Sequence, residues 1–272
     1  MRLFVLIFAS VLTAMILSSP NTVANPMPTP ESDGVPAPED SRLDILFKSE
    51  KVVYTIDTEN VARVVAVYVL QNSANNITSL NISLPFYYNV PKDIMLTSNG
   101  QPMPLEVVNL TSFGPSDYSY ARFHLDFAAC ETLTLNATYS LQYAVYYDYL
   151  FELLTAPGRV YNQHFWCSYI AETGKYWHNN LDSAEFQFRI KKDLYGSGLD
   201  GFQKTEESGY VVATKMYNDW KPDQNIDAKW ERPDVGRTVL AHGLLILIIV
   251  LIVVLTAVAV IILRRKKKGM PL

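Results

Sequence analysis

The sequence predicts an all-β fold, an antiparallel β-sandwich of one or two β subdomains, followed by one C-terminal transmembrane α-helix. Between the two ends of the chain, apolar and polar residues alternate with a period of two in many segments, which is typical of half-buried strands. No convincing long amphipathic helix pattern interrupts them. The third observation is the segment 243–263, an almost unbroken apolar run long enough to cross a bilayer.

The clearest strand is predicted over 131–147. From Leu133 to Leu141 every odd position is Leu, Ala or Tyr, and every even position is Thr, Asn or Ser, as in a long strand with one face in a core. Asn99-Gly100 indicates a two-residue hairpin turn. Further strands are predicted over 52–57, 61–70, 79–84, 94–97, 105–110, 118–127, 160–170, 185–190, 210–216 and 226–230.

Short strands at this spacing favour a sandwich. It is either one large sandwich over 42–232 or two β units joined near 148–158. We favour two units: an N-terminal β-sandwich-like domain over 42–147 and a second β subdomain over 148–232.

The N-terminal residues 1–24 predict a signal peptide. They combine a basic residue, Arg2, with an apolar run and small residues at a cleavage site after Ala24. The alternative is an uncleaved N-terminal anchor. Five prolines follow in 25–41, which predicts an extended, disordered leader.

The C-terminal segments predict a juxtamembrane stalk at 233–238, a transmembrane helix at 239–263 and a basic cytoplasmic tail at 264–272. Positive charge next to a span stays in the cytosol, so we expect a type I protein of the cell membrane with its N-terminal domain outside. Taken alone, the basic cluster also fits a nucleic-acid or nuclear-targeting patch. The predicted stop-transfer residues are Arg264, Arg265, Lys266, Lys267 and Lys268.

The predicted ectodomain is acidic. Without Arg2 and the five tail cations, 17 basic residues remain against 27 acidic ones, a formal net charge of −10. This argues against nucleic acid as a partner. The expected partners are the lipid bilayer, through the helix, and a protein or carbohydrate ligand of the ectodomain.

The two cysteines, Cys130 and Cys167, both lie in the predicted exterior. An exported chain meets an oxidising environment, so an even pair predicts one disulfide. The competing interpretation is a metal site formed by Cys167 with His164 and His178.

Four sequons make the chain a candidate glycoprotein in a host that performs N-glycosylation. Residue 136 falls on the polar face of the best strand, and residue 81 lies opposite apolar neighbours, so both can point to solvent. Coincidence is the alternative. The candidate acceptors are Asn76, Asn81, Asn109 and Asn136.

Tyrosine and tryptophan are concentrated between residues 143 and 177. Such side chains are favoured in recognition surfaces and in sugar-stacking platforms, although a tyrosine-rich core is the simpler explanation. Tyr146 and Tyr147 are adjacent, so one of them must leave the core face. We take Tyr146, Trp166 and Trp177 as the candidate recognition aromatics.

The sequence contains no catalytic motif for a nucleophilic triad, a zinc protease, a phosphate-binding loop or a dinucleotide fold. We therefore expect neither an enzyme nor a cofactor; the alternative is an exported hydrolase that uses His164 or His178. Segment 193–201 carries oxygen donors and glycines, but its spacing misses the EF-hand pattern, and we interpret it as a loop rather than a calcium site.

Four segments resemble an uncharacterised family of exported bacterial and archaeal proteins, known only as a domain of unknown function. The resemblance covers about 50–232 and implies an exported β-rich fold with a Thr-Gly-x-x-Trp element packed near the sheet. The segments are Ser83-Leu84-Pro85, Asn99-Gly100, Tyr169-Ile170-Ala171-Glu172-Thr173-Gly174-Lys175-Tyr176-Trp177 and Trp220-Lys221-Pro222-Asp223.

Together these observations predict a membrane-anchored extracellular β-sandwich that acts as a binding or structural module at the cell surface or in the envelope. The alternative is a non-catalytic accessory subunit of a membrane complex, in which the helix packs against partner helices.

Overall fold

The computed structural model of the chain describes residues 33–34, 37–38, 44–87, 90–109, 118–148, 160–171, 174, 176–222 and 224–267. The chain divides into two compact units, which are described separately. The β unit consists of Thr29–Tyr146 and Gln163–Arg232, and the second unit includes Tyr147–Asn162 and Pro233–Leu272. The predicted signal peptide, 1–24, lies outside the described residues.

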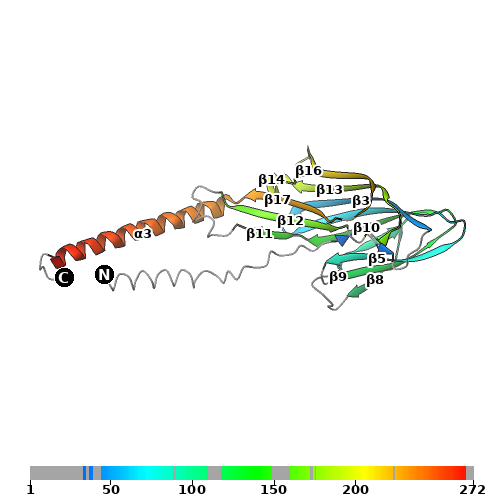
Figure 1. Cartoon of the computed structure of the whole chain (residues 1–272), viewed down its shortest axis with the longest axis horizontal. Coiled ribbons are helices and arrows are strands. Elements are labelled where there is room, and N and C mark those ends of the chain that lie inside the picture. Colours follow the sequence, from blue (N-terminus) through cyan, green and yellow to red (C-terminus); the bar gives the residue numbers. More distant parts are fainter. Residues whose placement is uncertain are drawn as a thin grey trace. The chain divides into compact units, whose positions relative to one another are not determined.

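One sheet, here called sheet B, contains the longest strands (Figure 1). Its order is β15-β16-β13-β3-β4-β10-β6-β7, and its neighbouring strands are antiparallel except for β13 and β3. The strands are β15 (Gln203–Glu207), β16 (Tyr210–Trp220), β13 (Leu181–Lys191), β3 (Ile45–Thr58), β4 (Val61–Asn72), β10 (Thr132–Gln142), β6 (Met95–Ser98) and β7 (Gln101–Pro102).

The other sheet, sheet A, has the order β14-β17-β12-β1-β5-β9-β8, with β11 also paired to β12 and β2 to β5. A 3₁₀ turn, η2 (Lys192–Leu194), precedes its first strand in that order. The strands are β14 (Ser197–Gly198), β17 (Ile226–Pro233), β12 (Asn162–Ile170), β1 (Asp33–Gly34), β5 (Thr78–Tyr87), β9 (Tyr118–Phe127), β8 (Glu106–Asn109), β11 (Ala144–Tyr147) and β2 (Ala37–Pro38).

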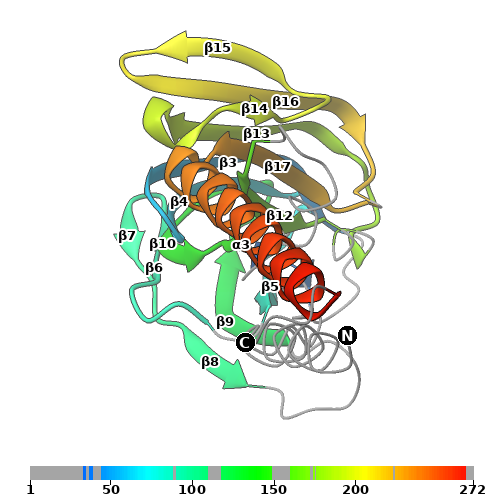
Figure 2. The ribbon, with the colours of Figure 1, turned by 90° about the vertical axis from the view of Figure 1, so that its left-hand side faces the viewer.

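The predicted β-sandwich is confirmed, because buried side chains from both sheets form one continuous core. In β10 the residues from Leu133 to Leu141 alternate between buried and partly exposed, as the sequence pattern requires. Figure 2 turns the molecule by 90° and shows the hairpin of β15 and β16 at one edge of sheet B.

The predicted division at residue 148 does not separate two β units. Both sheets combine strands from 42–147 with strands from 148–232. At the centre of sheet B, β3 and β13 pair in parallel, with Val52 opposite Phe186 and Tyr54 opposite Phe188. Parallel neighbours cannot be joined by a tight turn, so these strands come from distant parts of the chain. The sequence pattern gives the strands but not this pairing.

The leader predicted as disordered over 25–41 contributes two short strands. Asp33 of β1 pairs with Phe86 of β5 on one side and with Tyr169 of β12 on the other. Its backbone therefore joins β5 and β12 within sheet A. A Pro-rich segment can do this because two residues of extended backbone are enough to hydrogen bond to two neighbouring strands.

The predicted hairpin turn at Asn99-Gly100 connects β6 and β7. Both residues have positive φ, 46° and 81°, and Ser98 pairs with Gln101 across the turn. Positive φ at both central positions is the geometry that favours Asn-Gly in two-residue hairpins. This prediction is confirmed.

In the second unit, the helix α3 (Val235–Lys267) begins within the predicted stalk of 233–238, so most of that segment is helical. Asp234 explains the early start, because its Oδ1 accepts a hydrogen bond from the backbone N–H of Arg237 at 2.9 Å, as an N-cap does. Thr238 Oγ1 accepts the N–H of Tyr161 at 2.9 Å, and the Arg237 guanidinium lies 3.4 Å from the centre of the Tyr147 ring.

Helix α3 is long and apolar enough to cross a membrane over Val235–Arg265. Its 33 residues rise about 50 Å, more than the roughly 30 Å of a hydrocarbon core. In a bilayer, a helix of this length would extend beyond the apolar layer. Of the predicted stop-transfer residues, Arg264 to Lys267 belong to the helix and Lys268 lies outside the described residues.

Candidate functional site

Aromatic and charged side chains gather on the outer surface of sheet A, over β11, β12 and β17. In β12 the residues Gln163, Phe165 and Cys167 are buried, so His164 and Trp166, which alternate with them, point outward. In β17 the buried residues Ala228 and Trp230 likewise leave their neighbours outside. We call this surface the aromatic–charged face; it consists of Tyr146, His164, Trp166, Asp227, Lys229 and Glu231.

Trp166 is held in place from two sides. Its indole Nε1–H donates a hydrogen bond to Asp227 Oδ1 at 3.1 Å. The Lys229 ammonium lies 4.7 Å from the ring centre, within cation–π range, and 3.6 Å from Asp227 Oδ2. The indole is therefore fixed at the surface beside one positive and one negative group, an arrangement suited to recognition of a polar ligand.

Tyr146 and His164 form the second part of the face. Their rings stack with centroids 5.0 Å apart and an interplanar angle of 16°. His164 Nδ1 lies 3.6 Å from Glu231 Oε2, and Ser197 donates its hydroxyl hydrogen to Glu231 Oε1 at 2.9 Å. The face thus offers stacked rings together with hydrogen-bonding carboxylate and imidazole groups.

The inner side of the same strands is rigidly packed. The rings of Phe165 and Trp230 stack at 5.2 Å, and Tyr143 lies 5.5 Å from Trp230. Burial raises the pKa of Tyr143 well above its ordinary value, and its hydroxyl donates to the Thr58 carbonyl at 2.9 Å. Arg232 lies 5.8 Å above the Phe165 ring. This packing fixes the backbone that carries the outer face.

Two of the three predicted recognition aromatics come together and one does not. Tyr146 and Trp166 both belong to the aromatic–charged face. Trp177 is only 2% exposed and packs in the core 5.3 Å from the Phe47 ring, so its prediction as a recognition residue is wrong. Polar residues follow Trp177 in the sequence, so the sequence did not show whether its ring would point into the core or to solvent.

The structure adds Asp227, Lys229 and Glu231, which the sequence analysis did not propose as functional. The period-two pattern over 226–230 predicts that Asp227 and Lys229 face outward. Their proximity to Trp166 could not be predicted, because it depends on the pairing of β12 with β17.

The predicted disulfide is wrong: Cys130 and Cys167 are not bonded to each other. Cys130 is exposed in the turn between β9 and β10, where its thiol lies 3.1 Å from Asn75 Oδ1. Cys167 is 1% exposed, on the inner side of β12. The structure thus places the two thiols in different surroundings, one in an exposed turn and the other in the core.

The alternative metal site is not formed either. His164 and Cys167 lie three residues apart on one strand and so point to opposite faces, and His178 is exposed in the turn after Trp177. Within the described part of the chain, no three His, Cys, Asp or Glu side chains group in a way that could hold a metal ion.

The 193–201 segment, interpreted as a loop from the sequence, is partly regular: η2 ends at Leu194, and Ser197–Gly198 form β14. Its oxygen atoms bond to the protein: the carbonyl of Gly198 accepts from Lys204 Nζ at 2.9 Å, and that of Asp193 accepts from Arg232 at 2.8 Å. Ser197 is already bonded to Glu231.

The four sequons occupy different environments. Asn76 is exposed in the β4–β5 turn, and Asn81 on β5 is hydrogen bonded to His124 Nδ1 at 2.8 Å. Asn136 is partly exposed in the middle of β10. The side chain of Asn109 lies outside the described residues. The use of these sequons as glycan acceptors stays a prediction.

Two segments quoted for the family resemblance pack against each other. A Cβ atom on Gly174 would lie 2.3 Å from Pro222 Cγ, so the Pro222 ring can pack this closely only because residue 174 is glycine. The Lys221 ammonium donates to the Trp177 carbonyl. The Trp177 ring is buried and packs against Phe47 of β3.

No protein-family profile matches the chain, and no curated protein does. Among solved structures, a Legionella pneumophila protein provisionally described as nutrient binding superposes with a TM-score of 0.56 at 14% identity, over 74% of this chain and 71% of that one. This likeness shows the fold alone.

Two enzymes superpose less well. Leukotriene A4 hydrolase from Saccharomyces cerevisiae gives a TM-score of 0.40 at 9% identity, over 68% of this chain and 29% of the enzyme. The M1 zinc metallopeptidase from Deinococcus radiodurans gives 0.33 at 12%, over 64% of this chain and 39% of the enzyme. Both scores are too low to support an argument about activity.

Proposed function

We propose that this chain is a single-pass membrane protein whose β unit lies outside the cytosol and acts as a non-catalytic binding module. The observation that carries the proposal is the grouping of Trp166, His164 and Tyr146 with charged residues on one outer face of sheet A. Surface residues packed around an ordered tryptophan are typical of recognition sites.

A carbohydrate is the ligand class that this face favours. Sugar rings combine apolar C–H faces, which stack on Trp and Tyr rings, with hydroxyl groups that bond to carboxylate and ammonium groups. Trp166, Lys229 and Asp227 supply these groups within about one sugar ring of each other. The likeness to a protein provisionally described as nutrient binding is compatible with a small polar ligand.

An array of immobilised oligosaccharides, probed with the full chain in detergent, tests the proposal. We expect binding to some oligosaccharides that Trp166→Ala and Lys229→Ala abolish and Trp166→Phe retains in part. The matched control is Met216→Ala, which truncates an exposed apolar residue on the outer face of sheet B. Binding that survives Trp166→Ala would remove this face from the proposal, and no binding to any sugar would favour a protein ligand.

The proposed orientation has a separate test in the exposed thiol of Cys130. A membrane-impermeant maleimide should label Cys130 on intact cells, and Cys130→Ser should remove the label because Cys167 is buried. Labelling that requires permeabilised cells would reverse the orientation and contradict the exported module.

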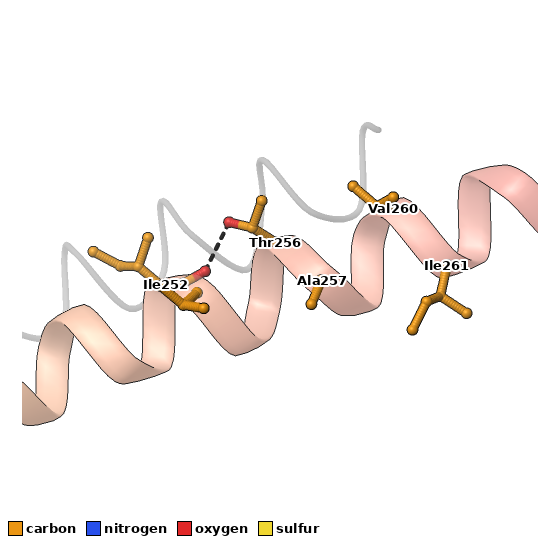
Figure 3. A pocket seen from close by; sticks show the side chains of 6 residues that line it. Ile252, Thr256, Ala257, Val260 and Ile261 are labelled. Atoms are coloured by element: carbon orange, nitrogen blue, oxygen red, sulfur yellow. Dashed lines mark hydrogen bonds between the residues drawn. The ribbon is translucent and has the colours of Figure 1, made fainter.

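A second candidate function, the accessory subunit of a membrane complex, is favoured by one feature of α3. A shallow apolar hollow on this helix offers space for a neighbouring helix (Figure 3). Thr256 donates its hydroxyl hydrogen to the Ile252 carbonyl at 2.7 Å, so its methyl group and Ala257 leave a small-residue gap. The hollow is lined by Ile252, Val253, Thr256, Ala257, Val260 and Ile261.

Filling the hollow distinguishes the two candidates. For an accessory subunit, Ala257→Ile should reduce the amount of chain that migrates in a larger complex on native gels of mild-detergent extracts. Val250→Ile, outside the hollow, should not. A chain that migrates alone in both variants and in the unmodified protein would exclude this second function.

A further inference from the structure

The outer surface of sheet B carries a groove of about 230 Å³. Exposed apolar side chains stand beside charged ones on this face: Val65 is 46% exposed and Met216 is 64% exposed, next to Lys51 and Glu185. Lys51, Val67, Glu185 and Met216 are among the residues that line the groove.

One row of residues crosses this face from strand to strand. Asn136 of β10 lies opposite Val67 of β4, which lies opposite Lys51 of β3. Lys51 in turn lies opposite Glu185 of β13, and Glu185 opposite Met216 of β16. We call this the Asn136 row. Four of its five members line the groove, and the fifth, Asn136, stands at its end.

The side chain of Asn136 points to the same surface as the groove. Its neighbours Leu135 and Ala137 are both fully buried, so alternation turns Asn136 outward. Adjacent strands are about 4.8 Å apart, so the row extends about 19 Å from β10 to β16. Asn136 begins the sequon Asn136-Ala137-Thr138, and Thr138 lies opposite the exposed Val65.

We propose that Asn136 carries an N-linked glycan that lies along the Asn136 row and covers the groove. The apolar faces of its first sugars would pack on Val67 and Met216, and their hydroxyl groups would bond to Lys51 and Glu185, whose ammonium and carboxylate are 3.0 Å apart. The glycan attached to Asn136 would thus cover the groove of the same chain.

The modification is a glycosyl transfer from a lipid-pyrophosphate-linked oligosaccharide. Asn136 Nδ2 attacks the anomeric carbon of the first sugar, and the new C–N bond replaces the bond from that carbon to the pyrophosphate oxygen. The lipid pyrophosphate leaves with the bonding electrons, and one amide proton passes to a base of the transferase. The proposal rests on the export of the β unit, which is part of the proposed function.

The acceptor residues of the other described sequons do not lie beside a groove of this kind. Asn76 lies in a turn, and its backbone carbonyl accepts a hydrogen bond from Asn72. Asn81 is on the outer face of sheet A, where His124 bonds its side chain and Asp126 in turn bonds His124. Neither residue lines the groove.

The test uses the full chain purified from the membranes of its own cells. An amidase that removes N-glycans converts each modified Asn to Asp, and peptide mass spectrometry then reads the occupancy of Asn136. Labelling of the folded chain with an amine reagent, before and after glycan removal, reports the covering of Lys51. Lys229, on the other sheet, is the internal control.

We expect Asn136 to be occupied and Lys51 to become more reactive when the glycan is removed, with Lys229 unchanged. Thr138→Ala, which keeps Asn136 but removes the acceptor sequence, should increase binding of a hydrophobic dye, whereas Asn76→Gln should not. The purified chain has already folded when the amidase removes its glycans. The reactivity of Lys51 can therefore be measured even if the Thr138→Ala variant does not fold.

An unmodified Asn136 overturns the proposal, and so does an occupied Asn136 whose removal leaves Lys51 reactivity unchanged. A glycan on Asn76 without one on Asn136 would overturn it while leaving the exported binding module intact. Labelling of Cys130 only after permeabilisation would instead contradict the proposed function itself.

Discussion

Tyr169 on β12 donates its hydroxyl hydrogen to the carboxylate of Glu50 on β3, 2.7 Å away, and so links the two sheets through the interior of the sandwich. Both residues are buried, at 0% and 3% exposure. Removing the hydroxyl would deprive the buried Glu50 Oε2 of this donor, and the loss of a buried hydrogen-bond partner costs more than the loss of an exposed one. We expect Tyr169→Phe to lower the free energy of unfolding by about 1–3 kcal/mol, measured by denaturant unfolding of the full chain in detergent.

A double-mutant cycle isolates this bond from the loss of other contacts. In a Glu50→Leu background, Tyr169→Phe should lower the free energy of unfolding much less, because the carboxyl group that accepts the Tyr169 hydrogen bond is absent. Equal costs in both backgrounds would show that the hydroxyl acts independently of Glu50.

Acid should weaken the fold through Asp57. A hydrogen bond from Tyr210 and another from Arg63, at 2.6 Å, hold the pKa of Asp57 below its ordinary value of 3.8. The unfolded chain therefore takes up this proton at a higher pH than the folded chain. The stabilisation is complete above the unfolded pKa and is lost as the pH falls through the folded one.

The measurement for Asp57 is unfolding between about pH 5 and pH 2. Asp57→Asn should lower stability at the upper end, and its difference from the unmodified chain should shrink as the pH falls. A difference that stays constant across the range would contradict the shifted titration. Asp200→Asn, in the exposed loop before β15, is the control.

Gly174→Ala should destabilise the fold, because its Cβ would lie 2.3 Å from Pro222 Cγ. Overpacking of this kind typically costs about 1–3 kcal/mol, which thermal unfolding would register as a lower Tm. Pro222→Ala in the same chain removes Cγ and should restore part of the loss. No rescue would mean that the cost lies in the backbone of residue 174 instead.

The start of α3 depends on Asp234. Asp234→Ala removes the acceptor of the Arg237 N–H, and loss of an N-cap costs about 0.5–2 kcal/mol. We expect faster amide hydrogen exchange at Arg237 and Thr238 in the variant. Asp234→Asn, which also caps helices well, should restore slow exchange; unchanged exchange in Asp234→Ala would show that the helix begins without this cap.

Strands with one buried face could be predicted from the sequence. The expected strand 118–127 coincides with β9, because the residues from Ala121 to Phe127 alternate strictly between apolar and polar. By contrast β15 was missed, since Gln203 to Glu207 are all exposed and polar and so carry no pattern. It is a strand only because the backbone of β16 lies beside it.

The burial of Glu50 was equally hidden. In β3 the residues Ile45 and Phe47 face the core, and continued alternation would place Ser49 there. The register shifts between Phe47 and Ser49, which turns Glu50 inward instead. A bulge changes which residues are inside without any mark in the composition.

The candidate site was half visible in the sequence. The exposure of Tyr146 and Trp166 follows from adjacency and alternation, but their charged neighbours come from a strand about 60 residues away, as the Trp166–Asp227 bond shows. The disulfide prediction was wrong for a related reason. An even number of cysteines in an exported chain does not say how far apart Cys130 and Cys167 lie in the fold. Only pairing of the strands decides which residues meet.

The parallel contact of β3 with β13 has a consequence for biogenesis. Residues 49–56 acquire their central neighbour only after residues 183–190 have been synthesised. Until then a long, apolar strand has one open edge, and such edges recruit other chains. Truncated or stalled products that end before residue 183 should therefore aggregate or need a chaperone. Synthesis of β13 is the step that pairs the open edge of β3 and so protects the sandwich from aggregation.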